Sequence, residues 1–168
     1  RAWFTFLADS AAAIVLKLGD GRKLLEQEDA AGEPPFDVLV LDVFAGDSQP
    51  LHMLTREAFE LYLRRMKPDG ILALHITSWH LNFLPLCKDI AARLDLHAEA
   101  FHDPGDPACL CKASTWVLLT RVPREYRPRP GVRRCDWSHV RDLPAPTDAC
   151  GSALRYLAIG KGALAAFE

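Results

Sequence analysis

The sequence has little of several features that would place it in a specialised class of protein. Aromatic residues make up 9% of the 168 residues, and there are 2 methionines. No apolar run approaches the roughly 18–20 residues of a membrane-spanning helix, and the start of the chain does not have the pattern of a secretory signal. The net charge of −2 favours neither nucleic acid nor an anionic membrane as a partner. We therefore expect a globular, cytoplasmic protein.

The cysteines follow neither a zinc pattern nor a disulfide framework. Their number is odd and no C-x-x-C is present, while Cys109 and Cys111 are one residue apart, too close for the usual zinc spacing. We expect free thiols, with a disulfide among these two, Cys135 and Cys150 as the alternative. Cys87 lies on the apolar face of an expected helix and is predicted to be a small core residue. No group of His, Cys, Asp or Glu has the spacing of metal ligands, so we expect no metal.

What is present is an ordinary globular composition with alternating strand and helix patterns. The apolar fraction is 49% and the charged fraction 25%, which suits one domain with a substantial core. Apolar runs predict strands at 13–19, 36–44, 71–76, 96–101 and 114–120. Helical periodicity predicts helices at 22–28, 55–67, 82–94 and 151–158. The basic, proline-rich stretch 121–134 is typical of an extended, solvated connector.

This order of elements predicts an α/β fold. Its sheet should be mainly parallel, with the last two strands as an antiparallel hairpin at one edge. The continuous apolar run 36–44 is typical of a strand that is covered on both faces. Ligands bind such sheets beyond the carboxyl ends of the strands, so polar residues at these ends are the candidates for a site.

Asp20 and Asp42 follow two of the expected strands. Asp20 lies between Gly19 and Gly21, which allow a sharp bend and a close approach by a ligand. A second interpretation makes Asp20 the N-cap of the helix at 22–28, and the spacing does not decide between the two. If both carboxylates face one crevice, they suit a cationic substrate or a general base. Asp47 is predicted to be a turn residue.

Two histidines are further candidates for the site, and two common catalytic motifs are missing from the sequence. His75 lies near the end of the strand at 71–76, where it could line the site or be a satisfied, partly buried residue. His52 precedes a helix, and a structural role in the loop is an equal alternative. There is no Walker loop and no G-x-S-x-G, so the sequence predicts neither a P-loop nucleotidase nor a serine hydrolase of that type.

Two stretches of the chain resemble a known family. "LGDGRKLLE" and "FDVLVLDVFAGDSQPLHMLTREAFELYLRRMKPDGILALHI" resemble the spermidine synthase (polyamine aminopropyltransferase) family. The similarity is stronger to its bacterial spermidine synthase-like branch, some members of which are fused to membrane transporter segments. It covers roughly residues 1–120. "PTDACGSAL" also resembles the late W-T-D-D segment of the family and keeps Thr147 and Asp148.

The resemblance implies a Rossmann-like domain of the class I S-adenosylmethionine methyltransferase type. It implies transfer of an aminopropyl group from decarboxylated S-adenosylmethionine to a polyamine such as putrescine, without a metal. Asp20, with Gly19 and Gly21, would contact the adenine amino group. Asp42 matches the first aspartate of the D-x-x-D loop, which holds the substrate amine and helps to remove its proton. The second aspartate falls on Ala45.

Three further residues complete the site that the resemblance implies. Asp47 would substitute, out of register, for the missing second aspartate of the loop. His75 and Asp148 would contact the substrate. The implied partners are a small polyamine and a nucleoside, with no nucleic acid, and we leave a homodimer open.

The sequence departs from the family in its first elements. The glycine-rich loop and the acidic residue after the second strand are absent, and the chain begins with Arg1, so we expect the N-terminal strands of the domain to be missing. We divide the chain into a partial domain at 1–122 and a connector with a helical segment at 123–168. Two alternatives stay open: an S-adenosylmethionine-dependent methyltransferase, and a degenerate binding module without catalysis. We expect that the chain alone could be inactive.

Overall fold

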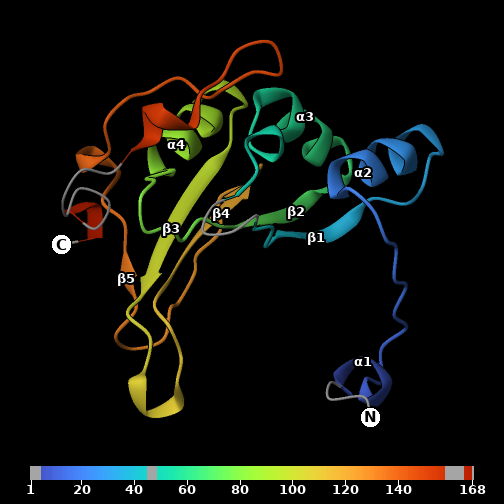
Figure 1. The fold of residues 1–168 in the computed structure, drawn as a ribbon, viewed down its shortest axis with the longest axis horizontal. Helices are drawn as coiled ribbons and strands as arrows, with labels where there is room; N and C mark the ends of the chain where they lie inside the picture. Colours follow the sequence, from blue (N-terminus) through green and yellow to red (C-terminus); the bar gives the residue numbers. More distant parts are fainter. Residues whose placement is uncertain (1–4, 45–48, 158–164, 168) are drawn as a thin grey trace.

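The computed structural model describes residues 5–44, 49–157 and 165–167. They form one five-stranded sheet in the order β1-β2-β4-β3-β5, with helices against it (Figure 1). The strands are β1 (Phe36–Leu41), β2 (Met66–His75), β3 (His97–Asp103), β4 (Ser114–Thr120) and β5 (Arg133–Arg134). The helices are α1 (Phe6–Asp9), α2 (Gly21–Ala30), α3 (Arg56–Arg64) and α4 (Leu84–Arg93). Short 3-10 turns lie at Leu51–Met53, Pro107–Cys109, Trp137–His139, Ala153–Tyr156 and Ala165–Phe167.

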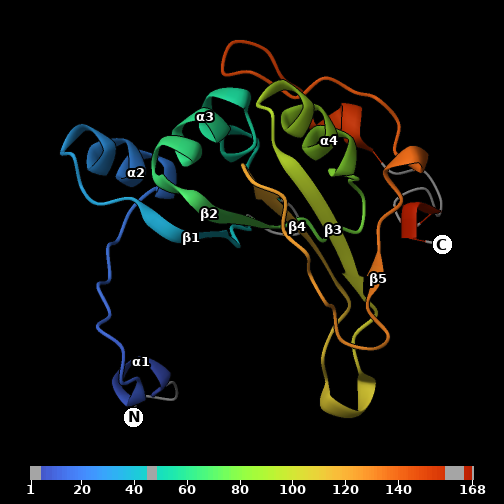
Figure 2. The same cartoon turned by 180° about the vertical axis from the view of Figure 1, so that it is seen from behind.

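The α/β class predicted from the sequence is confirmed. Strands β3 and β4 form the expected antiparallel hairpin. The sheet is mixed rather than mainly parallel, because β1 and β2 pair in parallel while β4 joins β2, and β5 joins β3, in the antiparallel sense. The hairpin is also not the outermost part of the sheet, since β5 continues it beyond β3. Helices α3 and α4 lie on the same side of the sheet, and α2 packs beside α3 (Figures 1 and 2).

The prediction of a strand at 13–19 is wrong. This segment is extended but makes no ladder with β1 or any other described strand, and its apolar side chains are exposed, with Val15 at 79%. A strand needs a neighbour for its backbone hydrogen bonds, and none is present beside this segment. The expectation that 36–44 is covered on both faces is also wrong, because Val38 and Val40 are 53% and 52% exposed. The described helices cover one face of β1, so the other stays open.

Helix α3 ends earlier than its apolar pattern predicts. The sequence suggested a helix over 55–67 that ends at Pro68, but α3 ends at Arg64 and β2 begins at Met66. The segment Pro68–Gly70 lies within β2, at a register shift in its pairing with β1. A Cβ on Gly70 would come within 3.1–3.2 Å of β1 carbonyl oxygens, so the absence of a side chain permits this close approach. The helix expected at 151–158 is, among described residues, only a 3-10 turn.

The core lies between the sheet and the helices α3 and α4. Leu72 and Leu74 of β2 are fully buried. The other fully buried large side chains include Phe59, Tyr62, Leu86, Ile90, Val117 and Leu119. Helix α4 confirms the helix predicted at 82–94, although it is shorter at both ends. Cys87 is a buried core residue, as expected. This core fixes the ends of β1 and β2, where the candidate site lies.

The last third of the chain runs back across the described fold. The backbone of Cys135 donates to Ala100 of β3 at 2.8 Å, and that of Asn82 donates to Tyr156 at 2.7 Å. Much of the basic stretch 121–134 is extended, as expected, and it also supplies β5. Within the described ranges, no helix has the length and apolar character needed to cross a membrane.

Candidate functional site

A polar cluster lies where the two parallel strands end. Asp42 follows β1 directly, and His75 is the last residue of β2. Because parallel strands present their carboxyl ends at the same edge of a sheet, the two side chains meet there: Nδ1 of His75 is 2.7 Å from Oδ1 of Asp42. On its other side, Nε2 of His75 is 2.7 Å from Oγ1 of Thr77. We call Asp42, His75, Thr77 and Trp116 the His75 cluster.

The hydrogen bonds of the His75 cluster specify where the imidazole carries its proton. The backbone N–H of Thr115 donates to Oγ1 of Thr77 at 2.8 Å. A carboxylate has no proton to donate, so Nδ1 is the donor in the contact with Asp42, and Nε2 accepts from the hydroxyl of Thr77. The neutral ring therefore carries its proton on Nδ1 and donates it to Asp42. The network holds His75 as a donor to the carboxylate.

Two aromatic side chains fix the plane of the His75 ring. Trp116 stacks on it with ring centroids 4.5 Å apart and an angle of 7° between the planes. Phe44 meets it edge-on at 5.0 Å. The side chain of His75 is thus held on two sides and 20% exposed, whereas the side chain of Asp42 is 55% exposed. Asp42 is the group of the cluster that a dissolved ligand reaches first.

Asp20 is the N-cap of α2, one of the two interpretations that its spacing allowed. Its Oδ1 accepts from the backbone N–H of Lys23 at 3.0 Å, and its Oδ2 lies 3.1 Å from Nε2 of His52. The hydrogen bond from Lys23 is the main cause that lowers the pKa of Asp20, and His52 adds to it. The carboxylate is thus anionic and fixed in direction, and it is still partly exposed.

Asp148 joins the C-terminal segment to α2 and α3. Both of its oxygens accept from the guanidinium of Arg22, at 2.7 and 2.5 Å. Thr55, the N-cap of α3, donates its hydroxyl to the same carboxylate at 2.7 Å. The hydrogen bond from Arg22 lowers the pKa of Asp148 to about 2, and that from Thr55 contributes. In the same pairing, Asp148 raises the pKa of Arg22.

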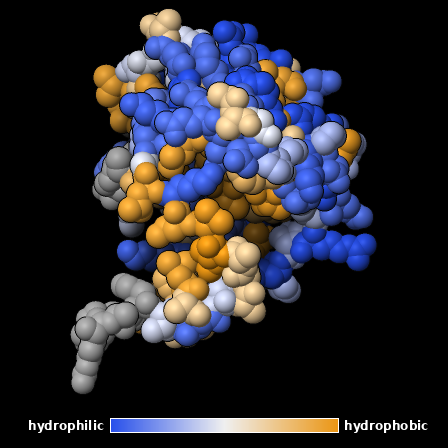
Figure 3. All heavy atoms as spheres, turned by 90° about the vertical axis from the view of Figure 1, so that its right-hand side faces the viewer, coloured by the Kyte–Doolittle hydropathy of each residue, from blue (hydrophilic) through white to orange (hydrophobic). Residues whose placement is uncertain are grey.

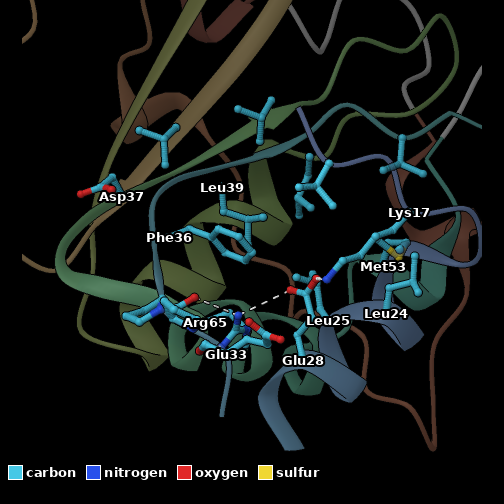
Figure 4. Close-up of a pocket in the computed structure, with 18 of the residues that line it drawn as sticks. Lys17, Leu24, Leu25, Glu28, Glu33, Phe36, Asp37, Leu39, Met53 and Arg65 are labelled. Carbon is cyan, nitrogen blue, oxygen red and sulfur yellow. Dashed lines mark hydrogen bonds and ion pairs between the residues drawn. The ribbon is translucent and has the colours of Figure 1, made fainter. Parts of the chain in front are cut away.

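A groove of about 1050 Å³ runs along β1, between this strand and α2. Figure 3 shows apolar side chains gathered around a hollow on this side of the molecule. The apolar lining includes Val15, Leu16, Leu24, Leu25, Val38, Leu39 and Val40. At one end, Glu28 pairs with Lys17 at 2.5 Å and with the buried Arg65 at 3.5 Å (Figure 4). The groove is therefore apolar along its length, with charges at one end.

The structure places the sequence-predicted residues in two separate groups. Asp42 and His75 lie together, while Asp20 and Asp148 lie near the start of α2 with Arg22 between them. Gly21 and Val43, each next to one of the aspartates Asp20 and Asp42, both line the groove. Among the described side chains, no hydrogen bond or ion pair joins the two aspartates. That one ligand reaches both carboxylates stays a prediction.

The remaining predicted residues have different outcomes. Asp47 lies outside the described residues. Gly19 has a φ of +151°, which L residues rarely adopt, so a glycine suits this position. At Gly21 a Cβ would only touch Met53 at 3.7 Å, so packing does not require glycine there. His75 has protein partners on both nitrogens, and its direct contact with a substrate stays a prediction.

Sequence reasoning missed four residues that organise these groups. Arg22 and Thr55 hold Asp148, and Thr77 and Trp116 hold His75. A signal was present for Arg22 and Thr55, which both belong to the stretches that resemble the family. The stacking of Trp116 on His75 joins strands that are distant along the chain, and no local pattern predicts it.

Among the described side chains, no group of three or more His, Cys, Asp or Glu could hold a metal ion.

Comparison with known proteins gives structural likeness alone. No family model matches the chain, and no curated protein matches it. A probable spermidine synthase from Corynebacterium glutamicum ATCC 13032 is similar in structure, with a TM-score of 0.45, 22% identity, and coverage of 67% of this chain and 39% of that chain. Human methyltransferase-like protein 13, in complex with SAH, gives a TM-score of 0.46, 14% identity, and coverage of 70% and 53%. The chain thus spans about two fifths of the length of the first of these proteins and about one half of the length of the second.

Proposed function

We propose that the chain is part of a spermidine synthase-like transferase, which moves an aminopropyl group from decarboxylated S-adenosylmethionine to a polyamine such as putrescine. The observation that supports this most is the arrangement of Asp42. Its carboxylate lies at the end of β1, is about half exposed, and is oriented by His75 at 2.7 Å. The resemblance of the surrounding sequence to the family's D-x-x-D loop points to the same residue.

The proposed reaction needs an anion that holds an amine and takes up its proton. A polyamine nitrogen is cationic in water and becomes nucleophilic only when it loses a proton. The free nitrogen then attacks the carbon next to the sulfonium. The new N–C bond forms as the C–S bond breaks, and methylthioadenosine leaves with the bonding electrons. Since the sulfonium is already a good leaving group, positioning and a base are the main requirements.

In this proposal, His75 acts through Asp42 and is a positioning residue. Its Nδ1–H donates to Oδ1 of Asp42, which leaves Oδ2 to accept from the substrate amine. The stacked Trp116 keeps the imidazole in the plane that this hydrogen bond needs. We expect loss of His75 to reduce transfer less than loss of Asp42 does, because the carboxylate would persist in a less defined direction.

The nucleoside would be placed at the other group. Asp20 has a fixed, partly exposed carboxylate, and a carboxylate oxygen accepts more than one hydrogen bond. Gly19 and Gly21 add no side chains beside it. These features fit the exocyclic amino group of an adenine. The sequence shows no glycine-rich loop for the rest of the nucleoside, so we expect weak binding to this chain.

The test is a transfer assay that follows methylthioadenosine and the new polyamine. The chain is supplied with putrescine and decarboxylated S-adenosylmethionine, and the variants are Asp42→Asn and Asp37→Asn. Asp37 is a matched control, because it is an exposed β1 carboxylate that pairs with Lys67. We expect at least a hundredfold loss from Asp42→Asn, in line with removal of a catalytic base, and little change from Asp37→Asn. Equal activity in both variants would contradict the proposal.

A parallel assay with S-adenosylmethionine tests the main alternative. A methyltransferase would release S-adenosylhomocysteine and would not use the decarboxylated compound. Turnover with S-adenosylmethionine alone would replace the proposed reaction with methyl transfer. If neither compound reacts or binds, the chain is a binding module or a part that needs other groups for catalysis.

A further inference from the structure

The hairpin loop between β3 and β4 carries two thiols that the proposed transfer does not use. This loop, residues 104–113, projects away from the helices at the far end of the two strands (Figure 1). Cys109 and Cys111 are both exposed and free in it. Leu110, between them, is 90% exposed. Two accessible thiols two residues apart at a loop tip form an arrangement of their own.

The backbone of the loop folds back on itself at this pair. Asp106 and Cys111 are cross-strand partners, with backbone hydrogen bonds of 3.0 and 2.9 Å in the two directions. Leu110 has a φ of 57°, in the left-handed region, which turns the chain between the two cysteines. Consecutive Cα atoms are about 3.8 Å apart, so a turn at the middle residue brings the outer two to about 5.5–6 Å. This separation lies within the range of disulfides.

The sulfur of each cysteine contacts another group of the same loop. Sγ of Cys109 is 3.5 Å from Oδ2 of Asp106, whose backbone pairs with Cys111. Sγ of Cys111 is 3.7 Å from the carbonyl oxygen of Cys109. The sulfur of Cys111 is thus directed back toward the residue that carries the other thiol.

We propose that Cys109 and Cys111 form a reversible disulfide within the hairpin, in exchange with a small-molecule disulfide such as glutathione disulfide. One cysteine thiolate attacks a sulfur of glutathione disulfide, and one glutathione thiolate leaves. The other cysteine then attacks the mixed disulfide and displaces the second glutathione. Two protein thiols are oxidised, one glutathione disulfide is reduced to two glutathione molecules, and the cysteine protons pass to the released thiolates or to water.

The other cysteines provide internal controls. Cys87 and Cys135 are buried, and burial raises the pKa of each thiol to about 12. Since the thiolate is the reactive form, both should be silent in the folded protein. Cys150 is exposed but lies outside the hairpin, in the segment next to Asp148. Three accessible thiols are therefore expected in the reduced protein.

The experiment equilibrates the folded chain in glutathione buffers of increasing oxidised fraction. Accessible thiols are counted with a chromogenic disulfide, and the mass of the intact chain is measured. The variants are Cys109→Ser, Cys111→Ser and, as the matched control, Cys150→Ser. All three positions are exposed, so we expect the variants to fold.

We expect Cys150→Ser to lose two thiols together, with a mass loss of two hydrogens and no glutathione, and the wild type to show the same change on the hairpin with one glutathione added at Cys150. Cys109→Ser and Cys111→Ser should each carry glutathione on the remaining hairpin cysteine. The proposal is overturned if the wild type carries glutathione on both hairpin cysteines, or links to a second chain instead. It is also overturned if either hairpin variant still loses two hydrogens in mass without gaining glutathione. These readouts are independent of aminopropyl transfer.

Discussion

Arg22 and Asp148 lie 126 residues apart in the chain, and the guanidinium of the first donates to both carboxylate oxygens of the second, at 2.7 and 2.5 Å. The same guanidinium donates to the backbone carbonyl of His52 at 2.7 Å, and His52 contacts Asp20. This one side chain therefore connects the C-terminal segment to the loop that precedes α3. A bidentate pair of this kind fixes direction as well as distance.

We predict that Asp148→Asn lowers the free energy of unfolding by about 1 kcal/mol at neutral pH. The fall of the pKa of Asp148 from 3.8 to about 2 corresponds to about 2.4 kcal/mol. Because the pair is partly exposed, water screens the interaction, and we expect less than half of this value. Because the pKa is lower in the folded state, this stabilisation is complete above about pH 4 and is lost as the pH falls through 2. Urea unfolding at pH 7, 4 and 2.5 measures it.

Arg22→Gln is the matching variant, and the double variant completes the cycle. If Asp148→Asn costs as much in the Arg22→Gln background as in the wild type, the two residues are not coupled and the prediction is wrong.

We predict that the neutral imidazole of His75 carries its proton on Nδ1. This follows from the carboxylate of Asp42, which only accepts hydrogen bonds and faces Nδ1 at 2.7 Å, so that Nε2 accepts from the hydroxyl of Thr77. Long-range proton–nitrogen correlation spectra distinguish the two tautomers. Asp42→Ala should allow both tautomers, while Asp37→Ala, at a carboxylate outside the His75 cluster, should leave the spectrum of His75 unchanged. A wild-type ring with its proton on Nε2 would contradict the assignment.

We predict that Leu72→Ala destabilises the fold by about 2–5 kcal/mol, the usual cost of removing a fully buried leucine. Leu72 is 0% exposed and lies in β2 between β1 and β4. Leu18→Ala removes the same atoms from an exposed position and should change the free energy of unfolding by less than about 0.5 kcal/mol. Thermal and urea unfolding compare the two. Similar losses would show that Leu18 is covered in solution.

We predict that Val38→Lys and Val40→Lys reduce concentration-dependent association. Both side chains face outward from β1, whose far edge has no partner among the described strands. A lysine on such a strand opposes edge-to-edge pairing. Sedimentation at several concentrations measures the effect. Leu41→Lys is the control at a buried position of the same strand, and we expect it to unfold the chain. Stronger association of the Val38 and Val40 variants than of the wild type would refute the prediction.

We predict that part of the stability is lost below about pH 6.5 through His102. Burial is the main cause that lowers the pKa of this histidine, and Arg133 adds to it. With the pKa lower in the folded state, the unfolded chain binds the proton first as the pH falls. The stabilisation is therefore present above the unfolded value near 6.5 and declines below it. His102→Gln should flatten this part of the curve, and an unchanged slope would exclude His102 as the cause.

Local patterns in the sequence predicted the parts of the fold that depend on neighbours along the chain. The buried face of α4 and the hairpin of β3 and β4 follow from short-range spacing, and the N-cap of α2 at Asp20 is one of the two interpretations that this spacing allowed. The segment 13–19 has the composition of a strand but forms none in the structure, because strand formation also needs a paired neighbour. Composition alone does not show whether a neighbour is present.

The candidate site shows the same division. Asp42 and His75 could be placed at one edge, since both end apolar runs that form parallel strands. The direct contact between them depends on how β1 pairs with β2, while the stacked ring of Trp116 and the amide that holds Thr77 depend on how β4 pairs with β2. Asp148 was identified from a resemblance, but its partner Arg22 was not, because nothing local links positions 126 residues apart.

The most direct test of Asp42 as the amine anchor is calorimetric titration of the chain with putrescine at low ionic strength. We expect binding that Asp42→Asn weakens at least tenfold, since a charge-assisted hydrogen bond of about 1.5–3 kcal/mol is lost, and that Asp37→Asn leaves unchanged. Equal binding by the wild type and Asp42→Asn, or equal weakening by both variants, would contradict the assignment of Asp42 as the amine anchor.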